Sequence, residues 1–208
     1  MDSRWANEHL QVIRTLMERA TIYRRALAPM MLASGCLGLA GAAAGILGDV
    51  ERPNSFVALW MSIGLLAAGA AAWLVRRQAL KEREPVWSPP TRRIAMAVLP
   101  AFSAGAVVGL IAGFDPAFRD APGVAVWLPV AWLILYGCAG HAAGFFMPRG
   151  IKVFGWIFVA GGCSLAAFHD PGLPMWRLGH LVMGAFFGAL HLAYGGYLFF
   201  TEQKDDPV

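Results

Sequence analysis

Residues 179–200 read GHLVMGAFFGALHLAYGGYLFF, a run of 22 residues without a charged side chain. A helix of about 20 apolar residues is long enough to cross the hydrocarbon core of a bilayer. The run nevertheless contains two histidines, His180 and His191. An imidazole in such surroundings needs a hydrogen-bonding partner, because an unpaired polar group in hydrocarbon is costly. The stretch therefore predicts a membrane-spanning helix, and its histidines are the first candidates for a site.

The rest of the chain repeats this pattern. Only 14% of the 208 residues are charged, where about a quarter is usual in soluble domains. The apolar runs between the charges are about 20 residues long and do not alternate as membrane β-strands would. The chain is thus predicted to be an all-α polytopic membrane protein, with six helices in three hairpins over residues 28–200 and a cytoplasmic tail at 201–208. The predicted spans are 28–47, 56–75, 94–113, 124–146, 151–168 and 178–200.

The positions of the 17 Lys and Arg residues predict the orientation of the chain. Fourteen of them precede the first span, follow the last, or lie between spans two and three or spans four and five, and three lie in the opposite loops. Cytoplasmic loops of membrane proteins carry such an excess of cations. Both termini are therefore expected in the cytoplasm and the chain in a bacterial inner membrane. A nucleic-acid partner is not expected, since it would need the cations gathered on one folded face.

Residues 1–27 are predicted to form an amphipathic helix that lies on the inner leaflet. Leu10, Ile13 and Met17 recur at helical spacing and form an apolar stripe, beside arginines that suit the headgroup layer. The alternative is that this helix docks a cytoplasmic protein partner. Together with the loop between spans two and three, it supplies a basic surface that faces lipid or a partner. The residues of this surface are Arg14, Arg19, Arg24, Arg25, Arg76, Arg77, Arg92 and Arg93.

Two stretches rich in small residues, GCLGLAGAAAG at 35–45 and GLLAAGAAAW at 64–73, are predicted to be packing faces. Small residues let helix backbones approach closely, and close contact is what holds a bundle together in lipid. Cys36, Cys138 and Cys163 all fall inside predicted spans, where they are expected to be buried as small apolar side chains rather than paired in disulfides.

His141 and His191 are the candidates for a cofactor site. Their depths, measured from the inner ends of their helices, differ by only about 5 Å. Such a pair could hold a b-type haem, or join a thiolate around another metal. The favoured alternative is that each imidazole makes a structural hydrogen bond and no cofactor is bound, with Tyr136 and Tyr194 as the expected partners. The predicted polar cluster consists of Tyr136, Cys138, His141, His191 and Tyr194.

His180 is predicted to lie near the outer surface without a ligand. It precedes His191 by about three helical turns, so both histidines are expected on the same side of their helix. The glycines after His180 resemble those of helix six in rhomboid-type intramembrane proteases. The span 124–146, however, contains no serine to act as the nucleophile.

No catalytic motif is found in the sequence. It has no lysine deep in a span, no GxxxxGKS/T phosphate loop and no HExxH zinc motif. The expected function is therefore that of a non-enzymatic membrane subunit or scaffold that engages lipid or a cytoplasmic protein partner, with self-association left open. The alternative is a transporter or channel for a neutral or apolar small molecule. That reading requires a cavity lined by Tyr136, His141, His191 and Tyr194.

The N-terminal segment LQVIRTLMERATIYRRALAP, residues 10–29, contains an I-R-x-x-M-E-R pattern. The pattern is carried by Ile13, Arg14, Met17, Glu18 and Arg19. It resembles the start of a group of uncharacterised bacterial multi-spanning membrane proteins. WSPPTRR at 87–93 and MPRGIKVFGW at 147–156 are similar to other parts of the same pattern. The resemblance implies a bacterial multi-pass membrane protein and no particular activity.

Overall fold

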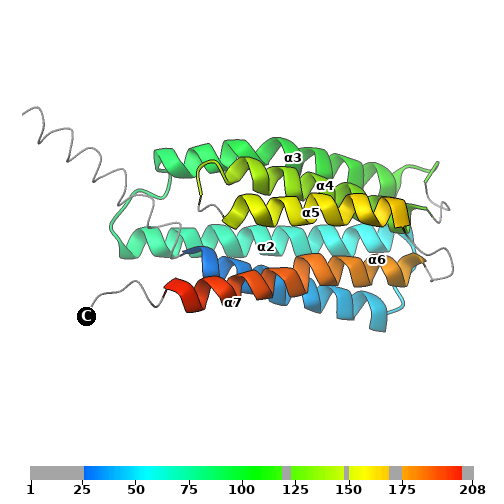
Figure 1. The fold of residues 1–208 in the computed structure, drawn as a ribbon. Coiled ribbons are helices and arrows are strands. Elements are labelled where there is room, and N and C mark those ends of the chain that lie inside the picture. Colours follow the sequence, from blue (N-terminus) through cyan, green and yellow to red (C-terminus); the bar gives the residue numbers. More distant parts are fainter. Residues whose placement is uncertain (1–25, 119–122, 148–149, 169–174, 203–208) are drawn as a thin grey trace, which may run out of the picture.

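The computed structural model describes residues 26–118, 123–147, 150–168 and 175–202. Within these ranges six helices are long and apolar enough to cross a membrane, and no strand is present. The helices run side by side in one elongated bundle (Figure 1). The predicted class, an all-α polytopic membrane protein, is confirmed. The predicted amphipathic helix falls almost wholly outside the described residues, and so does the I-R-x-x-M-E-R pattern.

The helices follow the predicted spans closely. The first helix is Ala26–Leu47, and the sixth span is Met175–Thr201. Between them lie α2 (Pro53–Lys81), α3 (Pro89–Phe114), α4 (Val124–Ala143) and α5 (Gly150–Phe168). The sixth span is built from α6 (Met175–Met183), the π-helical segment η1 (Gly184–Leu190) and α7 (His191–Glu202). The π-helical segment is a feature that the sequence did not predict.

Proline sets the boundary between α2 and α3. The helix α2 continues past the apolar region to Lys81, and the turn that ends it passes through Arg83 in a left-handed conformation with φ 53°. The prolines that follow cannot donate the hydrogen bonds of a continuing helix. They open α3 instead, in its first turn, where a missing N–H costs least.

The first and sixth helices pack along a row of glycines, which we call the glycine seam. Its members are Gly35, Gly38 and Gly45 on the first helix and Gly184, Gly188 and Gly195 on the sixth span. A Cβ atom at Gly38 would lie 2.7 Å from the backbone nitrogen of Gly188 and closer still to the Phe187 carbonyl. The backbones are therefore in contact, and the packing face predicted at 35–45 is present.

The second predicted packing face, at 64–73, is wrong. A Cβ atom at Gly64 or Gly69 would meet nothing within 4 Å in the described part of the chain. The helix α2 turns a different face inward, which carries Phe56, Val57 and Trp60. Gly64 and Gly69 therefore point away from the other described helices.

The helix α4 lies at the centre of the bundle. In its apolar stretch 50% of the residues are buried, against 11% in α2 and in α3. It packs most tightly against α5: a Cβ atom at Gly137 would lie 2.6 Å from the carbonyl oxygen of Gly155. The helices α2 and α3 are peripheral, and they expose large apolar side chains such as Leu65 and Leu99 outward, as lipid contact requires.

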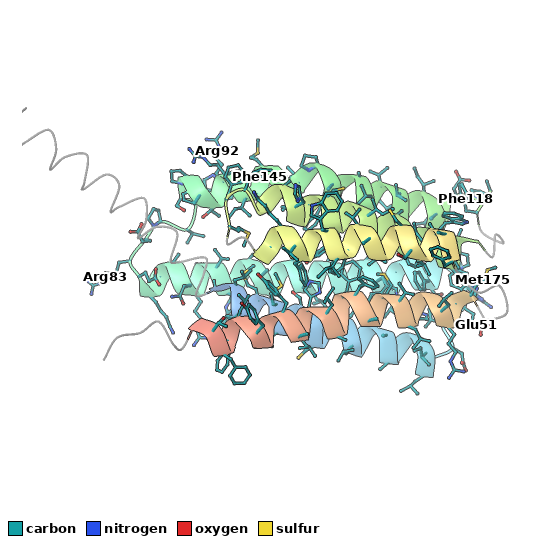
Figure 2. All side chains as sticks on the ribbon, viewed as in Figure 1. Glu51, Arg83, Arg92, Phe118, Phe145 and Met175 are labelled. Carbon is teal, nitrogen blue, oxygen red and sulfur yellow. The ribbon has the colours of Figure 1, made fainter. Side chains whose placement is uncertain are left out.

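The two ends of the bundle differ in charge. Figure 2 shows Arg83, Arg92 and Phe145 at one end and Glu51, Phe118 and Met175 at the other. The described cations of the first end, which we call the basic end, are Arg76, Arg77, Lys81, Arg83, Arg92, Arg93 and Lys152. The opposite end carries Arg52 and Arg177 among the described residues.

Candidate functional site

His180 is buried in the bundle, so the prediction that it lies at the outer surface is wrong. Its side chain is 1% exposed. The indole Nε1 of Trp60 donates to Nδ1 of His180 at 3.1 Å, and Nε2 of His180 lies 3.0 Å from the carbonyl oxygen of Val50. An indole N–H can only donate and a carbonyl can only accept. The imidazole is therefore the neutral tautomer protonated at Nε2, with both nitrogens satisfied.

The end of the first helix builds the space for His180. Asp49 adopts a left-handed conformation with φ 47°, and the Val50 N–H returns to the Gly45 carbonyl at 2.9 Å. This helix cap brings the Val50 carbonyl to the imidazole. Gly45 leaves room for the ring, since a Cβ atom there would lie 2.8 Å from Cγ of His180 and closer to Nδ1. His180 therefore ties the cap of the first helix to α2.

His191 is equally buried and is also fully hydrogen-bonded. Its Nε2 lies 2.7 Å from the hydroxyl of Tyr136 on α4, and its Nδ1 lies 3.0 Å from the Phe186 carbonyl in η1. Because the carbonyl can only accept, Nδ1 donates to it, and Nε2 accepts from the tyrosine hydroxyl. Three aromatic rings enclose the imidazole with centroids at 5.0, 5.6 and 6.0 Å, those of Phe154, Phe158 and Phe187.

His141 does not face His191, so the predicted pairing of these histidines is wrong. The His141 ring contacts Phe145 and Trp156, with centroids at 5.4 and 5.6 Å. Trp156 is about 200° around α5 from Phe154, which contacts His191. The two imidazoles therefore lie on opposite flanks of α5. Equal depth in the bilayer did not fix the direction in which each side chain points.

The predicted polar cluster is only partly assembled. Tyr136 and His191 are joined, and Tyr194 lies beside them, stacked on Phe154 with ring centroids 5.0 Å apart. Cys138 is not part of the cluster, because it is exposed on the outer surface of α4. The expected burial of the cysteines is wrong for all of them: Cys36, Cys138 and Cys163 are exposed.

The alternative of a haem or metal site at His141 and His191 does not fit these residues. A bis-histidine haem needs one free nitrogen from each imidazole aimed at the same iron. Both nitrogens of His191 are already engaged, and His141 lies on the far side of α5. In the described ranges no three His, Cys, Asp or Glu side chains gather as metal ligands would. His141 keeps its Nδ1 buried without a hydrogen-bond partner in this part of the chain.

Sequence reasoning missed the partners of His180. Trp60 is separated from it by 120 residues, and Val50 contributes only its backbone. A tryptophan inside an apolar run was a signal, because a buried indole N–H usually finds an acceptor. Trp132 obeys the same rule and donates to the Gly105 carbonyl of α3 at 2.8 Å.

The basic end carries a hollow of about 500 Å³. Its lining in the described part of the chain is Trp73, Arg76, Arg77, Leu80 and Lys81, all on α2. The Arg77 guanidinium lies 5.6 Å from the centroid of the Trp73 ring. No carboxylate of the described residues pairs with these cations, and that of Glu82 accepts a hydrogen bond from Gln78 at 2.6 Å.

Comparison with known protein families, with curated proteins and with solved structures finds no match for this chain. The geometry of the bundle is therefore what supports a functional proposal.

Proposed function

We propose that the chain is a non-enzymatic, multi-pass membrane subunit or scaffold that engages lipid or a protein partner through its basic end. The observation that carries this proposal is that the fully buried polar side chains of the described residues are used structurally, while the half-buried His141 is the one that keeps a ring nitrogen, Nδ1, without a partner in these ranges. Ser88, His180 and His191 are the buried polar side chains of the described ranges, and each is hydrogen-bonded within the chain. Groups that act on a substrate must instead be accessible to it.

The alternative of a small-molecule transporter is less well supported by the geometry. It requires Tyr136, His141, His191 and Tyr194 to line one cavity. The hydroxyl of Tyr136 is bonded to His191, their rings are packed among phenylalanines, and His141 lies on the other flank of α5. These contacts favour a structural role for the cluster.

The orientation of the chain in the membrane is part of the same proposal. The basic end holds the excess of the described cations, on helix ends and on the turn after α2, as the cytoplasmic side of a membrane protein does. We place the basic end and both termini in the cytoplasm, and the chain in a bacterial inner membrane. The N-terminal resemblance to bacterial multi-spanning proteins agrees with this location.

The test is to isolate the full chain from native membranes in a mild detergent and to identify retained lipids and proteins by mass spectrometry. Four Arg→Gln substitutions at Arg76, Arg77, Arg92 and Arg93 should remove what the wild type retains. The matched control replaces Arg52 and Arg177 of the opposite end with Gln and should remove nothing. A wild-type chain recovered alone, free of anionic lipid and of any stoichiometric partner, would count against the proposal.

A further inference from the structure

The exposed face of α2 combines three features that together match one kind of ligand. The hollow at the basic end is lined by cations without a described counter-charge, an indole ring lies beside them, and an open apolar face continues from it into the bundle's apolar zone. We propose that this face is a binding site for a single anionic phospholipid. The phosphate would contact Arg76 and Arg77, and an acyl chain would lie along Gly69. The proposal deepens the one above and rests on it, because it names the ligand of the basic end.

The headgroup part of the site is defined by charge and geometry. Arg76, Arg77 and Lys81 are exposed on α2, where the two arginines are adjacent and Lys81 lies one turn after Arg77. Guanidinium groups bind phosphate oxygens with two parallel hydrogen bonds, which lysine cannot do. Trp73 is 59% exposed, and an indole in this position suits the boundary between headgroups and hydrocarbon.

The acyl part of the site is defined by an absence of protein contacts. A Cβ atom at Gly69 would meet nothing within 4 Å in the described residues, while Leu65 and Leu66 are 71% and 58% exposed. These positions lie on the side of α2 that also carries Trp73 and Arg76, by the three- and four-residue spacing of a helix. From Leu65 to Arg76 the helix rises about 16 Å, close to the depth of one leaflet. One acyl chain therefore matches the length of the open face.

A protein partner fits this face less well. A second helix would have to accommodate two adjacent arginines at its edge, and the leucines beside Gly69 project as separate exposed side chains. A phospholipid supplies both the anion and the flexible apolar chain in one molecule. The chemistry of the site therefore favours lipid over a helix.

The experiment is native mass spectrometry of the full chain titrated with dioleoyl phosphatidylglycerol, with dioleoyl phosphatidylcholine as the neutral control. The wild type should bind phosphatidylglycerol in preference to phosphatidylcholine. The double variant Arg76→Gln, Arg77→Gln should lower the affinity for phosphatidylglycerol about 30-fold. The matched variant Arg92→Gln, Arg93→Gln removes the same charge from the same end and should change the affinity less than about threefold.

If the two double variants lose equal affinity for phosphatidylglycerol, the lipid is attracted to the basic end as a whole. That result would overturn the specific site while the proposed function stands. If neither double variant nor the fourfold variant loses affinity for phosphatidylglycerol, both the lipid site and the proposed function are overturned. Inorganic phosphate that displaced the lipid at equal concentration would also overturn the site, because it would leave no role for the acyl chain. If the glutamine variant fails to fold, Arg76→Lys, Arg77→Lys keeps the charge. A measurable loss of affinity supports the site, and no loss overturns it.

Discussion

The glycine seam makes a sharp prediction about stability. In Gly38→Ala the new methyl group would lie 2.7 Å from the Gly188 nitrogen and closer to the Phe187 carbonyl, where real Cβ atoms essentially never come within 3.0 Å. The obstructing atoms are backbone, so no side chain can rotate away. The first and sixth helices must separate by roughly 1 Å, which weakens dispersion contacts along the whole seam. Overpacking of this kind lowers the free energy of unfolding by about 1–3 kcal/mol. We expect the upper end of this range for Gly38→Ala, because the atoms in the way are backbone.

The matched control is Gly69→Ala, in the same kind of apolar helix. Nothing described lies within 4 Å of its Cβ position, so it gains only helix propensity, up to about 1 kcal/mol. The two variants should therefore differ by roughly 3 kcal/mol in free energy of unfolding, about a 150-fold difference in the folded-to-unfolded ratio. Reversible unfolding in mixed micelles, followed by far-UV circular dichroism, measures it. Equal stability of the two variants would refute the contact between Gly38 and the sixth helix.

Three further outcomes are expected. Tyr136→Phe removes the donor to His191 and should lower the free energy of unfolding by about 1–3 kcal/mol in the same assay; an unchanged value would show that the bond is not formed. Trp60→Phe should cost at least as much free energy of unfolding, because Nδ1 of His180 loses its donor and the smaller ring leaves a void in the core, and full stability would contradict the buried geometry. A reporter fused at Asp49 should report a location outside the cytoplasm, because this turn lies at the end of the bundle opposite the basic end. A cytoplasmic signal would contradict the proposed orientation of the chain in the membrane.

The spans were predictable because the bilayer imposes its requirement along the chain. A helix must carry about 20 apolar residues wherever it packs, so the length of the uncharged runs locates each span within a few residues. That tyrosines would be partners of the buried imidazoles followed from similar reasoning, since an imidazole in hydrocarbon needs a donor or acceptor and few are present. The particular pairing of Tyr136 with His191 was not predicted. These properties depend on composition and on local spacing.

The direction of each side chain around its helix was not predictable in the same way. His141 and His191 match in depth, but depth says nothing of which flank of α5 each occupies. Cys138 shares a helical face with His141, yet Cys138 is exposed while the His141 ring packs against Trp156 of α5. His180 lies near the end of its helix, where exposure is usual, yet the cap at Val50 and the ring of Trp60 cover it. Each of these errors concerns contacts between segments far apart in the chain.

The π-helical segment η1 changes the angle around the helix at which the two buried histidines project. A regular helix would place His180 and His191 only about 20° apart, but a π-turn accommodates about one extra residue and makes the later residues lag by about 100°. His180 can thus bond to α2 while His191 bonds to α4. A related sequence shorter by one residue in this interval could span it with a regular helix and still present both histidines in the same directions, because ten regular residues also turn the helix by about 280° beyond whole revolutions. In aligning other chains with this one, a single-residue gap between the histidines is therefore compatible with the same contacts, whereas an equal length without the π-turn would turn His191 away from Tyr136.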